Sequence, residues 1–96
     1  MILIIESLDL GKSSFQNDYK SLPDDIKVQL KERLKLLLED PRPKKLRLEK
    51  LSGYKKPGIY TIHITANHSH KLSFELVGSV AVLRRIGTHK DIDRKP

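Results

Sequence analysis

The chain has 96 residues, which is enough for one domain with a small two-layer core. It has no cysteine, which excludes disulfides, a thiolate nucleophile and cysteine-ligated zinc and is compatible with the reducing cytoplasm. Nineteen Lys and Arg residues against 12 Asp and Glu give a net charge of +7, so a polyanionic partner such as nucleic acid, a ribosome or an acidic protein is favoured. The apolar stretch at residues 1–5 is too short to span a membrane and lacks the features of a signal peptide.

The first predicted elements are a short strand over residues 2–5, buried on both faces, and a helix that begins near Ser13. Phe15, Tyr19 and Leu22 recur at i, i+4 and i+7, so they share one face of this helix. Ser21-Leu22-Pro23-Asp24 is the signal that the chain restarts as a second helix.

A second helix is the clearest element of the sequence. Ser21 is its expected N-cap, and Pro23 and the following acids suit its first turn. Its apolar stripe consists of Ile26, Leu30, Leu34, Leu37 and Leu38. The Asp-Pro-Arg-Pro sequence at residues 40–43 ends the helix, because proline lacks a donor and restricts the residue before it. The short connection between the two helices predicts an αα-hairpin.

The C-terminal half predicts an antiparallel sheet. Residues 44–51 alternate basic and apolar side chains, which is typical of an edge strand or an extended loop. Alternating strands then cover residues 58–66, 71–76 and 80–89. We therefore expect a single domain over residues 1–96 with an α+β fold, in which a three- to four-stranded sheet has helices on one face and an open, polar second face.

The polar positions of these strands carry histidine and cationic side chains. An imidazole transfers protons near neutral pH, and fixed cations stabilise developing negative charge, so the combination suits phosphodiester cleavage. His63 lies in mid-strand on the open face, where it is either a proton-transfer group or an ordinary exposed residue. His89 ends the last strand, and Lys71 begins the strand before it on the polar face. In a regular strand Arg85 shares its face with His89, which makes it the favoured site cation over Arg84.

Other basic residues are candidates for contacts with an RNA or ribosome backbone. They are Lys44, Lys45, Arg47, Lys50, Arg84 and Lys90. His68 and His70, at a hairpin tip, offer two metal ligands without a third at a known spacing, so a solvated turn is the preferred interpretation and no metal site is predicted. The segment after His89 holds one apolar residue and is expected to be loosely held.

Taken together, these motifs resemble the RelE/ParE toxin superfamily of toxin–antitoxin pairs. The pattern, spread over nearly the whole chain, is Phe15-x-x-Asp18-Tyr19-x-x-Leu22-Pro23, Asp40-Pro41-Arg42, Lys50-Leu51-Ser52-Gly53, Tyr60-x-Ile62-x-Ile64 and Arg85-Ile86-Gly87-Thr88-His89. The ending is most similar to the YafQ-type branch of ribosome-dependent mRNA endonucleases. The resemblance implies a cytoplasmic toxin, neutralised by an acidic antitoxin, that cuts ribosome-bound mRNA through attack of the substrate's own 2′-hydroxyl, without a metal or other cofactor.

The resemblance also implies roles for individual residues. His89 matches a catalytic histidine, His63 matches a histidine of the YafQ-type branch, and Lys71 stands where RelE and YoeB types place arginine. The sequence departs from the pattern at Glu49, where some relatives have histidine, and at Asp93, where an aromatic residue is expected. On these assignments His63 is the general base and His89 the general acid, although the two roles can be exchanged, and Lys71 and Arg85 stabilise the phosphorane.

Two alternative functions remain within the same superfamily. ParE-type toxins inhibit DNA gyrase and are not nucleases, but they generally lack this histidine-bearing terminus. A catalytically inactive relative that binds RNA or an antitoxin is compatible with the departures at Glu49 and Asp93.

Overall fold

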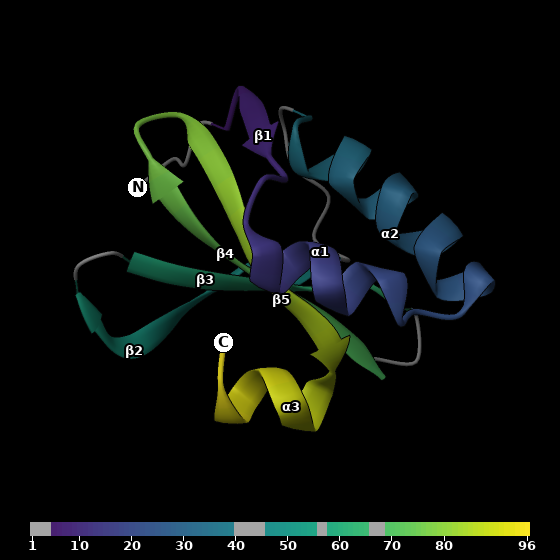
Figure 1. Cartoon of the computed structure of the whole chain (residues 1–96). Coiled ribbons are helices and arrows are strands. Elements are labelled where there is room, and N and C mark those ends of the chain that lie inside the picture. The colour runs from purple at the N-terminus through teal and green to yellow at the C-terminus, as the bar shows by residue number, and fades with distance from the viewer. Residues whose placement is uncertain (1–4, 40–45, 56–57, 66–68) are drawn as a thin grey trace.

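The structure is a computed structural model that describes residues 5–39, 46–55, 58–65 and 69–96. In chain order its elements are β1 (Ser7–Asp9), α1 (Ser13–Lys20), α2 (Asp24–Leu37), β2 (Glu49–Lys55), β3 (Gly58–His63), β4 (His70–Val77), β5 (Val80–Thr88) and α3 (His89–Arg94) (Figure 1). The expected α+β class and the two consecutive helices are confirmed. None of the described helices is long and apolar enough to cross a membrane.

The strands form one five-stranded sheet in the order β1-β5-β4-β3-β2. The three strands predicted most clearly pair antiparallel, with Tyr60 opposite Phe74 and His63 opposite Lys71. β1 adds to the outer edge of β5 in parallel, so the sheet is mixed. The predicted edge strand after residue 44 is present as β2, although it begins later, at Glu49.

The last strand is not regular. Ser73 of β4 is opposite Arg85, whereas the next residue, Phe74, is opposite Leu83, so Arg84 is an extra residue in β5. Such a bulge interrupts the alternation of side chains between the two faces. Moreover, His89 begins α3 and is not part of the strand. The bulge lies before Arg85, however, and the pairing from Arg85 to Thr88 is regular, so Arg85 lies on the polar face with its partner Ser73. The expectation is wrong for His89 alone, which is outside the strand.

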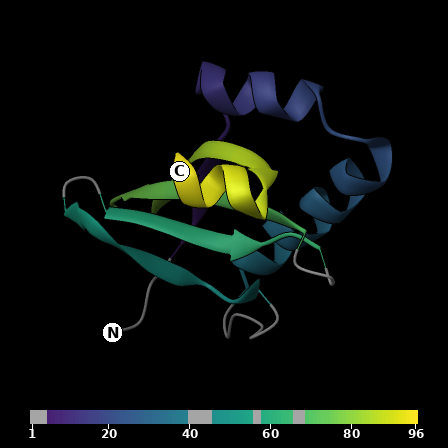
Figure 2. The ribbon, with the colours of Figure 1, turned by 90° about the horizontal axis from the view of Figure 1, so that it is seen from below.

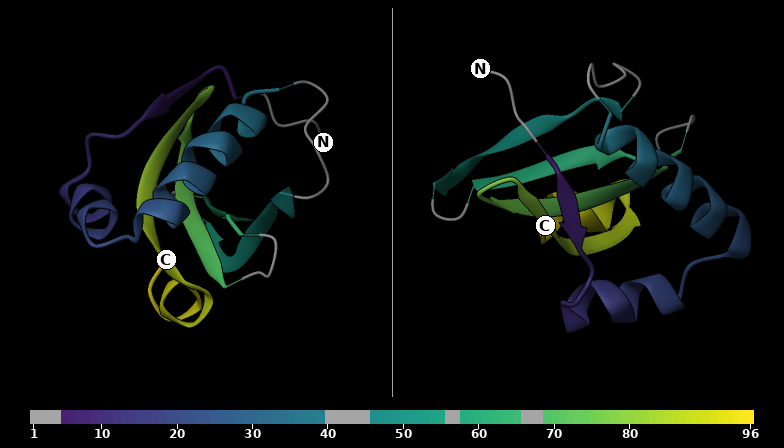
Figure 3. Two further views of the ribbon diagram at one scale, coloured as in Figure 1. Left: turned by 90° about the vertical axis from the view of Figure 1, so that its right-hand side faces the viewer. Right: turned by 90° about the horizontal axis from the view of Figure 1, so that it is seen from above.

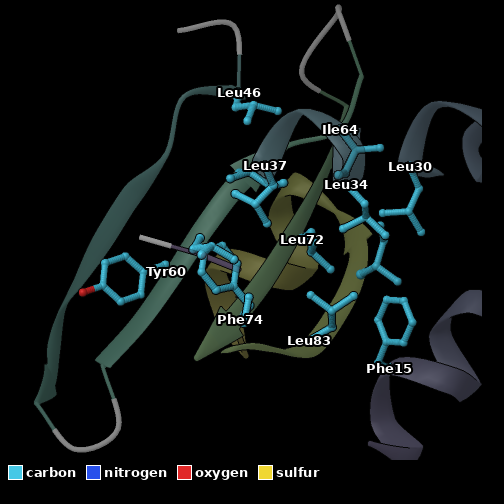
Figure 4. Close-up of a cluster of buried hydrophobic side chains, with 14 of the residues drawn as sticks. Phe15, Leu30, Leu34, Leu37, Leu46, Tyr60, Ile64, Leu72, Phe74 and Leu83 are labelled. Atoms are coloured by element: carbon cyan, nitrogen blue, oxygen red, sulfur yellow. The ribbon is translucent and has the colours of Figure 1, made fainter. Parts of the chain in front are cut away.

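The hydrophobic core lies between the helical hairpin and one face of the sheet. Its helical side chains are Phe15 from α1 and Ile26, Leu30, Leu34 and Leu37 from α2. They meet the apolar alternation of the strands, Tyr60, Ile62, Leu72, Phe74 and Leu83 (Figure 4). This packing explains why α2 forms where predicted, since its stripe at a spacing of three to four residues is buried almost completely.

Several local predictions at the N-terminal end are corrected. Ile5 is buried, but the first described strand starts at Ser7, because residues 7–9 are those that pair with β5; residues 1–4 of the predicted strand lie outside the described residues. The N-caps are Lys12 and Pro23, and neither accepts a side-chain cap hydrogen bond. Leu38 follows the last turn of α2 and is 40% exposed, so it is not part of the buried stripe.

The second face of the sheet is covered, contrary to the expected open face. α3 lies in front of the sheet when the molecule is seen from below and behind it when seen from above (Figures 2 and 3). It packs against β4 and β5, and the polar side chains of this face, among them Thr61, His63 and Ser73, are buried. The helices therefore lie on both faces, and the polar alternation of the strands forms an interior layer.

The C-terminal segment is held by a small number of well-defined contacts. Thr88 caps α3, since its side-chain hydroxyl accepts a hydrogen bond from the Asp91 backbone N–H at 3.3 Å. Ile92, the single apolar residue of the segment, is fully buried. The prediction of a loosely held terminus was wrong because one apolar side chain on the inner face suffices to seat so short a helix.

We predict that Ile92→Ala lowers the free energy of unfolding by about 2 kcal/mol or more, because it removes buried methylene and methyl groups at a site fixed by the sheet. Amide hydrogen exchange across residues 89–94 should accelerate. Val28→Ala, at a position that is 65% exposed, is the control and should change stability by no more than about 0.5 kcal/mol. Unchanged exchange in α3 after Ile92→Ala would show that this helix is held by other contacts.

Candidate active site

Three of the predicted site residues meet where α3 begins. His63 from β3 lies beside His89, with 5.7 Å between the centroids of the two rings. Lys71 is opposite His63 in the neighbouring strand β4. A fourth residue, Asp93 of α3, joins them: its Oδ1 lies 2.8 Å from Lys71 Nζ and its Oδ2 lies 2.9 Å from His89 Nδ1. These four residues are called the His–Lys–Asp cluster below.

The members of the cluster differ strongly in exposure. Lys71 is 4% exposed and His63 is 7% exposed, because α3 covers the face from which they project. The His89 side chain is 48% exposed and that of Asp93 is 44% exposed. Of the two histidines, His89 is therefore the more accessible with α3 in place, and the charge of Lys71 is balanced from within the protein.

Arg85 makes its hydrogen bonds outside this cluster. Its Nε donates to Asp18 Oδ2 at 2.6 Å and its Nη2 donates to Asp18 Oδ1 at 3.4 Å, which is a two-point contact with α1. The hydrogen bond that Arg85 donates to Asp18 raises the pKa of Arg85, burial opposes this effect, and the negative charges of Asp18 and Asp91 add to the increase. Arg85 also donates to the Lys95 carbonyl at 3.4 Å, so it links α1, β5 and the end of α3.

The remaining predicted contact residues are spread over the surface. Arg84 pairs with Glu75 at 3.3 Å, and Lys12 reaches the same carboxylate at 3.4 Å. Arg47 precedes the edge strand β2, and Lys50 lies within it. Lys50 Nζ lies 5.9 Å from the centroid of the Tyr60 ring. Lys90 is exposed in the first turn of α3. Lys44 and Lys45 lie outside the described residues.

His70 makes its side-chain hydrogen bond outside the cluster. His70 Nδ1 is hydrogen-bonded to Ser69 Oγ at 2.8 Å. His68 lies outside the described residues. Within the part of the chain that the structure describes, no group of three or more His, Asp or Glu side chains is arranged to hold a metal ion.

Sequence reasoning did not assign a role to Asp93 or to Asp18, although both organise the site. The signal for Asp93 was its spacing from His89, because i and i+4 are neighbours on a helix. That signal was missed because the segment was not expected to be helical. Asp18 gave no such signal, since its partner Arg85 is 67 residues away in sequence.

Comparison with known proteins gives a consistent result at the level of the fold. No protein-family model and no curated protein sequence matches this chain. Among solved structures, RelE–RelB from Pyrococcus horikoshii OT3 superposes with a TM-score of 0.63 at 14% identity, covering 91% of this chain and 96% of that one. RelB–RelE from Methanococcus jannaschii gives 0.62 at 24% identity, covering 88% and 96%. The chain has a RelE-like toxin fold.

A bacterial toxin shares this RelE-like fold as well. A copper-bound mutant toxin from Helicobacter pylori gives a TM-score of 0.58 at 21% identity, covering 95% of this chain and 99% of that one. The likeness extends over nearly the full length of each chain. In this RelE-like fold the His–Lys–Asp cluster lies where the central strands β3, β4 and β5 meet the C-terminal helix.

We predict that Asp18→Asn lowers the free energy of unfolding by about 1.5–3 kcal/mol, the typical value of hydrogen bonds to a charged group. The substitution removes the anion beside Arg85 and weakens the acceptor of the Ile86 backbone N–H, which lies 3.2 Å away. Because the folded-state pKa of Arg85 is raised, its contribution is fully present below the ordinary arginine pKa and is lost only as pH rises through the folded value.

The measurement is urea unfolding of Asp18→Asn beside Glu32→Gln, which neutralises an exposed acid on α2. Both variants lose one carboxylate, so a general charge effect would appear in both. Equal stabilities of the two variants would refute a structural role of the Asp18–Arg85 pair.

Proposed function

We propose that this chain is the toxin of a toxin–antitoxin pair and that it is a metal-independent endoribonuclease that cuts mRNA on the ribosome. The observation that carries the proposal is the pair of histidines with ring centroids 5.7 Å apart, next to a lysine, in a RelE-like fold. Two imidazoles at such a distance suit a reaction that needs one proton acceptor and one proton donor.

The proposed reaction is an internal transfer at phosphorus. The 2′-hydroxyl oxygen of the substrate attacks the adjacent phosphorus while a base removes its proton. The bond to the 5′-oxygen of the next nucleotide breaks, and that oxygen takes a proton from an acid. The products are a 2′,3′-cyclic phosphate and a 5′-hydroxyl, and water is not consumed.

His89 is the proposed proton donor to the leaving 5′-oxygen, since its side chain is half exposed. His63 is the proposed base and would reach the 2′-hydroxyl through the small part of its surface that α3 leaves uncovered. Arg85, whose side chain is 32% exposed, is the proposed cation for the charge on the phosphorane. The ammonium group of Lys71 is buried and already paired with Asp93 at 2.8 Å, so we assign it a positioning role.

We predict that expression of the chain without a partner arrests growth by loss of translation and that new mRNA 5′ ends appear. His89→Ala should reduce the cleavage rate roughly 10²–10⁴-fold, the usual contribution of a general acid or base. His63→Ala should also reduce it. The matched control is His70→Gln, which removes an imidazole that contacts Ser69 and should retain the rate.

The readouts are mapped mRNA ends in cells and single-turnover cleavage on programmed ribosomes with purified protein. Full activity of His89→Ala would overturn the site assignment. Intact transcripts together with inhibition of purified DNA gyrase would favour the ParE-like alternative. Intact transcripts, active gyrase and retained antitoxin binding would identify an inactive relative.

We further propose that the partner is an acidic antitoxin that places an apolar side chain in a groove between α1 and α2. The groove has a volume of about 320 Å³ and an apolar lining that includes Phe15, Tyr19, Leu30 and Leu34. Its rim carries Lys20 and Lys31, and Lys27 Nζ lies 5.1 Å from the centroid of the Tyr19 ring. An apolar seat with a cationic rim is complementary to an acidic segment that carries apolar anchors.

We predict that Lys31→Glu slows association with the antitoxin by roughly 3- to 10-fold at low salt, because a reversed rim charge weakens electrostatic steering. Lys50→Glu is the matched control, since it changes the net charge equally but lies on β2, at the opposite edge of the sheet from the β1 and β5 side to which α1 packs. Association rates measured over a salt series check this. Equal slowing by both variants would show that net charge, and not the groove, governs binding.

A further inference from the structure

Asp93 contacts two other members of the His–Lys–Asp cluster, and one of these contacts joins α3 to β4. Its two carboxylate oxygens have different partners: Oδ1 lies 2.8 Å from Lys71 Nζ on β4, and Oδ2 lies 2.9 Å from His89 Nδ1 at the start of α3. A carboxylate held at both oxygens has little freedom to rotate. The position of the His89 ring is therefore tied, through Asp93, to the central strand of the sheet.

The lysine end of this connection is fixed by burial. The Lys71 side chain is 5% exposed, and burying an ammonium group without an anion beside it costs several kcal/mol. In the described residues Asp93 is the acid that pairs with it. The requirement for a counter-ion at Lys71 therefore sets where the Asp93 carboxylate lies.

The histidine end determines which ring nitrogen carries a proton. An ionised carboxylate only accepts hydrogen bonds, so the nitrogen that faces Asp93 must be the protonated one. That nitrogen is Nδ1 of His89. In the neutral ring Nε2 then has the free lone pair, and in the charged ring it carries the second, exchangeable proton.

We infer that Asp93 is a positioning residue that holds His89 in the Nδ1–H form and so makes Nε2 the atom that exchanges protons with the substrate. The inference rests on the proposed function for its catalytic meaning, whereas the protonation pattern of His89 can be measured without it. Lys71 is the group that holds Asp93 in turn. Lys71 is buried and does not contact the substrate. Through Asp93 it nevertheless affects the reaction, because it fixes the carboxylate that holds the His89 ring.

The test begins with the unmodified protein. Nitrogen-15 NMR at alkaline pH, where imidazole is neutral, should show His89 Nδ1 protonated and Nε2 unprotonated. In Asp93→Asn the carboxamide can donate as well as accept, so the Nε2–H form should become dominant. Asp93→Glu keeps a carboxylate one methylene further out and should restore at least part of the Nδ1–H form. Asp91→Asn removes an acid from the same short helix and should leave the His89 spectrum unchanged.

Single-turnover cleavage supplies the second readout. Asp93→Asn should lower the rate roughly 10- to 100-fold, the loss found when a carboxylate that orients a metal-bound imidazole is removed, and Asp93→Glu should recover part of it. An Nε2–H form in the unmodified protein, or a spectrum that Asp93→Asn does not change, would overturn the inference. Full cleavage by Asp93→Asn despite an altered spectrum would overturn the catalytic part alone. Absence of cleavage by the unmodified protein, with the expected spectra, would refute the proposed function and leave the positioning of His89 supported.

Discussion

A lysine ammonium group that is almost fully buried must have an anion next to it, and this constraint organises the functional half of the molecule. Lys71 is in this situation on the central strand β4, and the anion comes from Asp93 in the last helix. Burial and pairing are coupled here, since α3 both covers the lysine and supplies its counter-ion. Because the same helix begins at His89, the ion pair also brings the two histidines of the cluster together.

Both faces of the sheet are buried, but the side chains on the two faces differ in chemistry. One face packs Leu and Ile side chains against α2 and provides most of the apolar burial. The other face carries Thr61, His63 and Ser73 beneath α3 and is buried but polar. A polar layer of this kind gains little stability from burial, but it increases the strength of the electrostatic interactions inside it. Of the two histidines, His63 lies on a strand of the sheet and His89 begins the helix that covers it, and His89 is the more exposed of the two.

Features that depend on neighbouring residues could be predicted from the sequence, whereas features that depend on contacts between distant residues could not. The stripe of α2 and the alternation of β3 and β4 are local patterns, and each was visible without a structure. His63, Lys71 and His89 were also predicted as site residues, because their residue types and register indicated proton transfer beside a cation. The bulge at Arg84 was not predictable, since nothing in the local alternation shows an extra residue, and it places Leu83 and Ile86 on the same, apolar face. Arg85 instead contacts Asp18 on α1.

By itself, the sequence determined the α+β class, the two consecutive helices followed by the antiparallel strands, the apolar core face and the clustering of chemistry-bearing residues near the C-terminus. These features follow from side-chain period and residue type, which are properties of neighbouring positions. Only the tertiary structure decided that the polar face is covered, that Asp93 bridges Lys71 and His89, and that Arg85 forms an ion pair with Asp18 of α1. The reason is that a helix of six residues with one apolar side chain has too weak a local signal to be recognised. Its position is set by the buried Ile92 and by the need of Lys71 for an anion, and both depend on residues that are distant in sequence.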